Sequence, residues 1–514
     1  ARVFWMLTGC AVVQIEAGDY PQRWNYIRPD MGSDGGVDAF VALLQESKAA
    51  GCTHILINEG RYLRQAEDTA YVARVNRVLG AARSLNLTIV PAVYPFGYSG
   101  RYLGFDRNLA AGLPVRDMPF VVRGGRAVPD LAYAPDLSGL DTTHSGPLKV
   151  RPFTHYRISF LTTTAPEHLS RIISLNSRHR RHMRGHPRAV PAGERFLITA
   201  TFNSLEADSL GLRIQAEGVI DSLRIEPTGL LMVLRRSLTP LVVAARDGKT
   251  RYEEGRDFEP VRDPVIAQTE GEMTMDHEAP AIVLTPHSRI READRLGVSF
   301  FHAYRVEGEQ DVISLEDPAV FDLMQKDIAL CLKVWAPTEF FMNYDEIRVG
   351  GWEKPDVKLG ATLATHIQKG CEIIRANAPG ARIYTWSDMF TPFHNARPFE
   401  AREEYYYLAN GNWDGAWEGL PKDVIVMNWY AKESEALAFF SDRGNSQILC
   451  GFYDARDEEA LKKNVAHWMG LSEGVPNVLG TMYTTWERNY DSMNHFFELV
   501  NTFEKGRQEG KSGK

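Results

Sequence analysis

The feature that most constrains the fold is a short apolar run followed by a stretch of helical periodicity, which recurs in two blocks of the 514-residue chain. This alternation is typical of βα units and a parallel sheet. The runs with the length of a strand are 3–7, 54–58, 88–94, 339–343, 382–386, 424–429, 447–453 and 478–483. Eight such strands predict an α/β fold, a (β/α)8 TIM barrel, with functional groups at the carboxyl ends of the strands.

The segment between the two blocks has a different pattern. From about 118 to 265, short alternating runs are separated by Gly, Pro, Asn and Asp, which is typical of a β-sandwich. Because barrel loops tolerate long insertions, we expect a β-sandwich domain inserted after the third barrel strand. The expected division is 1–117 and 266–505 for the two parts of the barrel, 118–265 for the sandwich and 506–514 for a disordered tail.

A ninth apolar run, at 298–304, has no place in an eight-stranded barrel. No convincing crossover helix separates it from the run at 88–94, and parallel neighbours need such a helix. We therefore expect this run to extend the third βα loop toward the functional site.

Composition and charge exclude several classes of protein. A net charge of −8 disfavours a protein that binds nucleic acid or an anionic membrane through its global charge. The sequence contains no run of about 18 apolar residues, so we expect no membrane-spanning helix. The five cysteines are scattered without metal-ligand spacing, so we expect neither a metal nor a cofactor. The oligomeric state stays open. The first residue, Ala1, fits a mature chain after signal removal or a shortened chain, so the compartment stays open, with a secreted or periplasmic location favoured.

Aromatic and acidic residues follow the later strands, in the clusters 343–346, 386–388, 428–430, 453–454 and 486–488. Eight of the ten tryptophans lie between Trp335 and Trp486. Aromatic faces stack on the C–H face of a sugar, and carboxylates bind its hydroxyls or move protons. These clusters predict a site for an oligosaccharide or polysaccharide, although rings that plug the barrel mouth beside solvated acids would give the same pattern.

The adjacent carboxylates Asp345 and Glu346 are the most informative pair. The segment EFFMNYDEIRVGGW resembles the fourth-strand signature H-x-G-G-D-E of the family 20 glycoside hydrolases, the β-N-acetylhexosaminidases. The segments TIVPAVYPFGYSG, IYTWSDMF, VIVMNWY and GTMYTTWE resemble other motifs of that family in the same order. The resemblance covers the barrel, about two thirds of the chain, and does not extend to the inserted sandwich.

The resemblance implies retaining, substrate-assisted cleavage of a β-linked N-acetylhexosamine, in which the acetamido oxygen of the sugar is the nucleophile. It implies roles as follows: Glu346 as acid and base, Asp345 as the residue that orients the acetamido group, Tyr430 as donor to the acetamido oxygen, Trp386, Asp388 and Trp429 in the sugar pocket, Trp486 and Glu487 as closing wall and hydroxyl acceptor, and Arg2 as a sugar-binding arginine.

The chain departs from the family pattern near the third strand and before the carboxylate pair. Asn343 and Tyr344 replace two glycines, and Tyr98 stands where a histidine is expected. His302 could supply the missing imidazole to the substrate site, or it could be a buried structural residue.

Two alternatives remain open from the sequence. In one, Glu346 works with a second carboxylate across the barrel, from Asp388, Asp454 or Glu487, in a two-carboxylate glycosidase that acts on a neutral or anionic polysaccharide. In the other, the chain is a carbohydrate-binding protein without catalytic activity.

Overall fold

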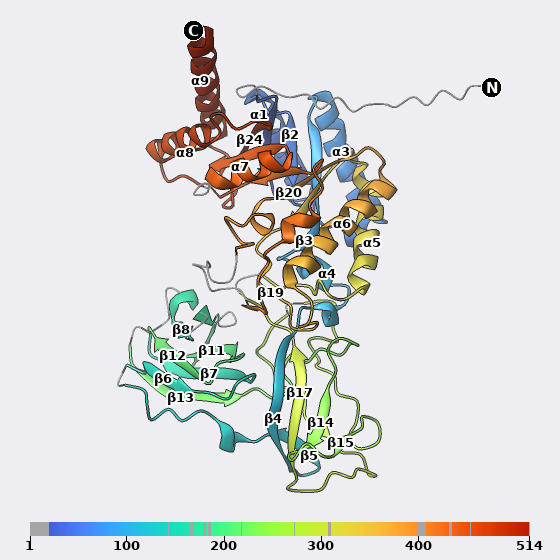
Figure 1. The fold of residues 1–514 in the computed structure, drawn as a ribbon, viewed down its shortest axis with the longest axis vertical. Helices are drawn as coiled ribbons and strands as arrows, with labels where there is room; N and C mark the ends of the chain where they lie inside the picture. The colour runs from blue at the N-terminus through green and yellow to red at the C-terminus, as the bar shows by residue number, and fades with distance from the viewer. Residues whose placement is uncertain are drawn as a thin grey trace, which may run out of the picture.

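The computed structural model describes residues 20–512 except 142, 165–168, 178–180, 183–186, 217, 272, 307–309, 398–407, 431–433 and 453. Eight parallel strands close into a barrel in the order β1-β2-β3-β18-β20-β22-β23-β24. They are β1 Gln22–Ile27, β2 His54–Ile57, β3 Thr88–Phe96, β18 Glu339–Tyr344, β20 Arg382–Trp386, β22 Ile425–Asn428, β23 Gln447–Phe452 and β24 Val478–Thr484. The barrel forms the upper part of the molecule in Figure 1. The structure thus confirms the (β/α)8 barrel.

The segment 3–7, where the first strand is expected, lies outside the described residues. The barrel begins instead with β1, which pairs in parallel with β2 and β24. Its aromatic residues Trp24 and Tyr26 face the barrel interior, while Asn25 faces the helices and donates a hydrogen bond to Ser47 (2.9 Å). A search for continuous apolar runs misses such a strand because polar residues alternate with its rings.

Helices cover the outside of the barrel. They are α1 Asp34–Ala49, α2 Tyr62–Gln65, α3 Thr69–Ser84, α4 Gly100–Leu103, α5 Ala319–Trp335, α6 Leu359–Asn377, α7 Ser434–Arg443, α8 Glu458–Leu471 and α9 Met493–Ser512. The N-cap side chains of Ser33, Asp68 and Asp457 accept backbone N–H groups and so fix the starts of α1, α3 and α8. Because α9 continues to Ser512, the described part of the expected disordered tail is helical. No helix in the described part of the chain is long and apolar enough to cross a membrane.

The insertion follows the third barrel strand and contains three antiparallel sheets. Two four-stranded sheets, β10-β11-β7-β13 and β6-β12-β8-β9, enclose one apolar core and form the expected sandwich. Their strands are β6 Gly146–Lys149, β7 His155–Thr162, β8 Ile173–Asn176, β9 Arg181–His182, β10 Arg188–Ala192, β11 Arg195–Asn203, β12 Ser209–Ile214 and β13 Ile220–Pro227.

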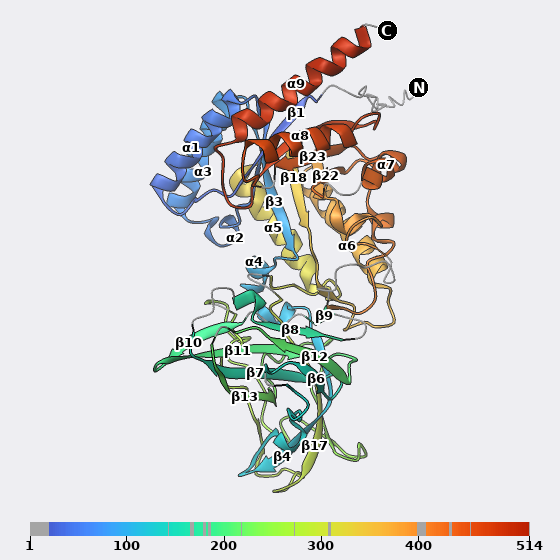
Figure 2. The same cartoon turned by 90° about the vertical axis from the view of Figure 1, so that its left-hand side faces the viewer.

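A third, six-stranded sheet connects the sandwich to the barrel, and Figure 2 shows the barrel and the insertion at opposite ends of the molecule. Its strands are β4 Leu113–Arg123, β5 Arg126–Pro129, β14 Val242–Ala245, β15 Arg251–Tyr252, β16 Ile282–Val283 and β17 Arg295–His302. The ninth apolar run forms β17, which pairs with β4 outside the barrel. The domain boundaries at 118 and 265 remain a prediction. The antiparallel strand β4 begins before residue 118, and the antiparallel strands β16 and β17 follow residue 265.

A buried carboxylate ties α5 to the end of β3. Asp327 is fully buried and accepts hydrogen bonds from the hydroxyls of Tyr62 (2.5 Å) and Tyr102 (2.6 Å) and from the backbone N–H of Tyr94 (3.0 Å). Burial raises the pKa of this carboxyl, and the three donors oppose the shift. The network joins α2, α4 and α5 behind the third strand, on which one wall of the candidate site is built.

Replacing Asp327 with Ala should leave three buried donors without an acceptor and lower the unfolding free energy by about 3–5 kcal/mol. The matched variant Tyr102→Phe removes one donor together with its bond, so it should cost about 1 kcal/mol. Chemical denaturation of both variants measures the difference. Equal stability of Asp327→Ala and the wild type would contradict the structural role of the network.

Candidate functional site

Asp345 and Glu346 leave the carboxyl end of β18, where parallel barrels place their functional groups. Along β18, Phe341 faces the barrel interior and Asn343 accepts a hydrogen bond from Trp386 Nε1 (2.9 Å), so alternation directs Asp345 to the same side. Glu346 has a φ of +47°, a left-handed conformation that is uncommon for a non-glycine residue and clusters at functional sites. The turn needs Gly97, because a Cβ atom there would lie 1.9 Å from the carbonyl oxygen of Asp345.

Both carboxylate oxygens of Glu346 have partners. Tyr98 and Gln310 donate hydrogen bonds to Oε2 (2.5 and 3.2 Å), and the Arg348 guanidinium pairs with Oε1 (3.0 Å). These partners come from three segments: the turn after β3, the segment returning from the insertion, and the turn after β18 itself. They hold the carboxylate in one orientation, as acid–base catalysis requires.

Asp388, after β20, is the third carboxylate of the site. It is fully buried and accepts hydrogen bonds from the backbone N–H of Glu346 (2.9 Å), Asn395 Nδ2 (2.7 Å) and Trp429 Nε1 (3.2 Å). Burial raises the pKa of Asp388 to about 6, and the nearby charge of Glu346 acts in the same direction. The three hydrogen-bond donors oppose this shift.

Asp345 shares this environment with Asp388. Burial and the charges of Asp388 and Glu346 raise the pKa of Asp345 well above its ordinary value, while Arg348 and Arg28 oppose the shift. Its Oδ1 atom is buried without a hydrogen-bond partner. Two desolvated carboxyls that repel each other cannot both ionise cheaply, so the pair holds a proton to higher pH than an isolated Asp does.

Aromatic rings surround the carboxylates at the barrel mouth. Trp386 and Trp486 pack edge to face at 6.1 Å, and the Tyr26 ring lies against both. The Arg28 guanidinium lies over the rings of Tyr26 and Trp486 (5.7 and 5.8 Å). The site therefore combines a charged floor with apolar faces.

Tyr430 and Glu487 contact residues that flank the carboxylates. The Tyr430 ring stacks on His394 at 4.1 Å, and His394 packs against Trp429. Glu487 is exposed, and its backbone N–H donates to Asp454 (3.2 Å). Asp454 also accepts from the Trp486 N–H (2.7 Å), so it fixes the turn after β24.

One predicted site residue, His302, is placed outside this cluster. His302 is fully buried in the insertion, where its ring stacks on His155 at 3.8 Å and its Nε2 bonds to Asn203 (2.9 Å). Burial lowers its pKa to about 4. It is thus placed as a neutral residue of the insertion core, because β17 belongs to the antiparallel sheet. Arg2 lies outside the described residues.

Sequence reasoning missed several residues that the fold brings to the site, namely Tyr26, Arg28, Gln310, Arg348 and Asn395. Arg28 follows β1 directly, so the error in the first strand concealed both Arg28 and Tyr26. Arg348 follows the carboxylate pair closely in the sequence. This spacing was the one sequence signal for an ion pair with Glu346. Gln310 and Asn395 lie on loops, and nothing in the sequence marks them. In the described part of the chain, no three His, Cys, Asp or Glu side chains are grouped to hold a metal ion.

No protein-family model matches the chain, and no curated protein matches it. Among solved structures, the chain is similar to a chitobiase from Flavobacterium johnsoniae (9% identity, TM-score 0.37, 94% of this chain and 52% of that one). It is similar to a family 20 exo-β-N-acetylglucosaminidase from Vibrio harveyi (9%, 0.40, 94% and 53%) and to a rhamnosidase from Novosphingobium sp. PP1Y (9%, 0.39, 94% and 59%). The chain spans just over half the length of these three proteins. Any function must therefore be argued from the site itself.

The carboxyl pair has a predictable effect on stability. In the folded protein Asp345 and Asp388 hold protons to higher pH than in the unfolded chain, where an Asp has a pKa of 3.8. The stabilising contribution of Asp388 is fully present below pH 4 and is lost as the pH rises through about 6. The contribution of Asp345 has the same sign, because its pKa is also raised on folding. Asp345→Asn, which cannot ionise, should stabilise the protein at pH 8 by about 1–2 kcal/mol and have little effect at pH 4.

Thermal melts of Asp345→Asn and the wild type at pH 4 and pH 8 measure this difference. The control is Glu194→Gln at an exposed position of the insertion, which should leave both melting temperatures unchanged. A variant that is less stable than the wild type at both pH values would show that the ionised pair is not strained.

Proposed function

We propose that the chain is a retaining glycoside hydrolase that cleaves β-linked N-acetylhexosamine from glycans, with the 2-acetamido oxygen of the sugar as nucleophile. The observation that carries the proposal is the pairing of Asp345, whose buried Oδ1 lacks a partner, with the firmly oriented carboxylate of Glu346 at the end of one barrel strand. One carboxylate can orient the acetamido group while its neighbour acts on the glycosidic oxygen.

Asp345 would accept the acetamido N–H. An unpartnered buried acceptor is costly, so an N–H donor that reaches Oδ1 is stabilised there. The atom is buried in this structure, so the sugar must displace the side chains that cover it. The hydrogen bond would favour the ionised form of Asp345 and so oppose the upward shift of its pKa.

Glu346 would act first as acid and then as base. It would protonate the glycosidic oxygen while the acetamido oxygen attacks the anomeric carbon, and then take a proton from the water that opens the cyclic intermediate. Tyr98, Gln310 and Arg348 keep its carboxylate in place. In this proposal Tyr430 donates to the acetamido oxygen, and Glu487 accepts from a sugar hydroxyl.

The remaining predicted site residues would form the sugar pocket. Trp386, Trp429 and Trp486 would supply apolar faces for the pyranose ring. Asp388 would position the others, since it holds both the Glu346 backbone and the Trp429 indole.

Glu346→Gln should reduce kcat on a disaccharide of β-linked N-acetylglucosamine by about 10²–10⁴-fold, because the leaving sugar needs a proton. The loss should be smaller on the 4-nitrophenyl N-acetylglucosaminide, since 4-nitrophenolate leaves with little protonation. Steady-state kinetics on both substrates, with Glu194→Gln as a control at an exposed site, measure the ratio. Full activity of Glu346→Gln on the disaccharide would overturn the assignment.

Substrate assistance can be tested on the substrate. Successive fluorination of the N-acetyl group makes its oxygen a poorer nucleophile, so kcat/KM should fall at each step from acetyl to trifluoroacetyl. Measurement on the wild type with a 4-nitrophenyl series gives the trend. No dependence on fluorination would exclude the acetamido oxygen as nucleophile while leaving a glycosidase intact.

A two-carboxylate glycosidase is the second candidate, and one observation favours it. Asp345 itself has the raised pKa expected of a general acid, and the carboxyl groups of Asp388 and Glu346 lie near it. The sequence offered Asp388, Asp454 and Glu487 as the second carboxylate. Asp388 is the one that contacts the carboxylate pair, because it accepts a hydrogen bond from the Glu346 backbone N–H. Asp454 instead fixes the turn after β24, and Glu487 is exposed. Hydrolysis of 2-hydroxy glycosides without hydrolysis of 2-acetamido glycosides would select this candidate.

A further inference from the structure

A second polar cavity lies beside the carboxylate site. It has a volume of about 250 Å³ and is lined by Arg64, Arg101, Arg107, Arg305 and Asp311, and also by Thr269, Gly271 and Met273. We propose that this arginine cavity binds an oxyanion, a sulfate, phosphate or carboxylate group. The volume is several times the roughly 30 Å³ that a water molecule occupies in the liquid, so a tetrahedral oxyanion fits.

The described residues that line the cavity carry four guanidinium groups and one carboxylate. That carboxylate, Asp311, forms a bidentate pair with Arg305 (3.0 and 2.9 Å). The other three guanidinium groups donate to carbonyl oxygens: Arg64 to Gly104 and Thr269, Arg101 to Asn58, and Arg107 to Val265, Glu270 and Gly271. Carbonyl groups satisfy N–H donors without neutralising a formal charge. An anion in the cavity would supply a negative charge to these three groups.

The guanidinium groups are held in place before any ligand binds. Arg107 is 4% exposed and is fixed by its three carbonyl acceptors. Arg64 and Arg101 pack directly on glycines, since a Cβ atom on Gly104 would lie 2.6 Å from Arg64 Nη2 and one on Gly60 would lie 2.4 Å from Arg101 Cδ. Such preorganisation lowers the entropy lost when an anion binds.

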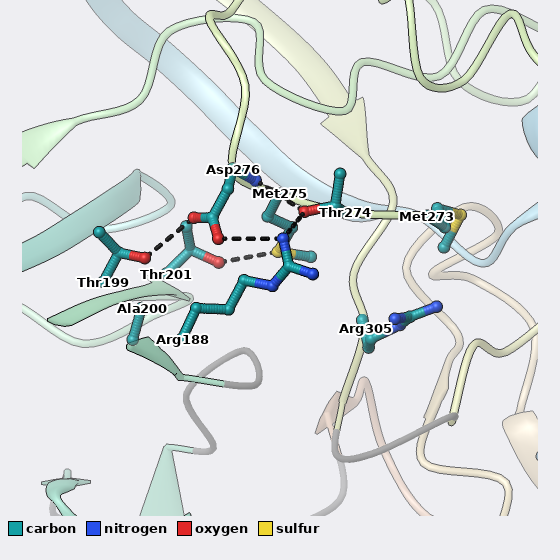
Figure 3. Close-up of a pocket in the computed structure, with 9 residues that line it drawn as sticks. All are labelled: Arg188, Thr199, Ala200, Thr201, Met273, Thr274, Met275, Asp276 and Arg305. Atoms are coloured by element: carbon teal, nitrogen blue, oxygen red, sulfur yellow. Dashed lines mark hydrogen bonds and ion pairs between the residues drawn. The ribbon is translucent and has the colours of Figure 1, made fainter. Parts of the chain in front are cut away.

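A neighbouring pocket offers a contrast. Figure 3 shows the smaller pocket, which shares Met273 and Arg305 with the arginine cavity. Its volume is about 30 Å³, room for roughly one water. Its Arg188 already pairs with Asp276 (3.4 Å) and donates to Thr274 (3.0 Å). The smaller pocket thus lacks both the space and the uncompensated charge.

The arginine cavity and the carboxylate site share a wall. Tyr98 and Gln310 bind Glu346, and the residues that follow them in the chain, Gly100–Arg101 and Asp311, line the cavity. A backbone hydrogen bond from Ser99 to Asp311 (2.7 Å) joins the two segments. An oxyanion in the cavity would therefore lie behind the residues that orient Glu346, either free or carried by a glycan bound at the site.

Calorimetric titration of the full chain with sodium sulfate, and separately with sodium phosphate, at low ionic strength tests the proposal. We expect saturable one-to-one binding of at least one of the two, weakened about tenfold or more in Arg101→Gln and in Arg64→Gln. Arg64 is exposed, so its variant should remain folded even if Arg101→Gln does not. The control Arg126→Gln, at an exposed position of β5, should bind like the wild type.

Absence of saturable binding of both ions, or equal binding by the wild type and the Arg64→Gln variant, would overturn the proposal. A kinetic arm identifies the source of the anion and rests on the proposed function. If the glycan carries it, kcat/KM should be higher for a sulfated or phosphorylated N-acetylglucosaminide than for the plain sugar, and Arg64→Gln should remove the preference. Binding of the inorganic ion without such a preference would indicate a free oxyanion. Loss of the hydrolase proposal would leave the calorimetric result unaffected.

Discussion

The electrostatic repulsion between the desolvated carboxyls of Asp345 and Asp388 is the interaction on which the site depends. Barrel closure places β18 beside β20, so the carboxyls that follow these strands share one low-dielectric environment. Burial and their mutual repulsion raise the pKa of Asp345, and the nearby Arg348 and Arg28 oppose this shift. The surrounding packing must offset this strain, as is common where a protein keeps reactive groups buried.

The insertion reaches the site through the segment that returns from it to the barrel. Gln310 on this segment contacts Glu346, and Asp311 lines the arginine cavity. Arg236 anchors the insertion, because its almost buried guanidinium pairs with Asp317 (3.0 Å) and with Glu353. The segment that returns from the insertion thus supplies Gln310, which orients the Glu346 carboxylate. The ion pairs of Arg236 hold the insertion against the barrel.

Strands buried on both faces were predictable because their sequences are continuous apolar runs. The segment VIVMNW can be identified as a buried strand from its own apolar run. The polar residue near its end indicates where the strand reaches the barrel mouth. QRWNYI was missed because its inward and outward faces carry different residue types. The same error hid Arg28. His302 shows the opposite limit, since a histidine in an apolar run gives no sign of which sheet the run will join.

The sequence by itself determined the barrel, the place of its insertion and the grouping of Asp345, Glu346, Asp388 and the tryptophans, because these depend on local periodicity and on the rule that parallel strands end at one edge. Only the tertiary structure decided which carboxyl is desolvated, which partners orient Glu346, and that four arginines from segments distant in the sequence line one cavity. Burial and charge proximity are properties of the packed chain, and no local pattern encodes them.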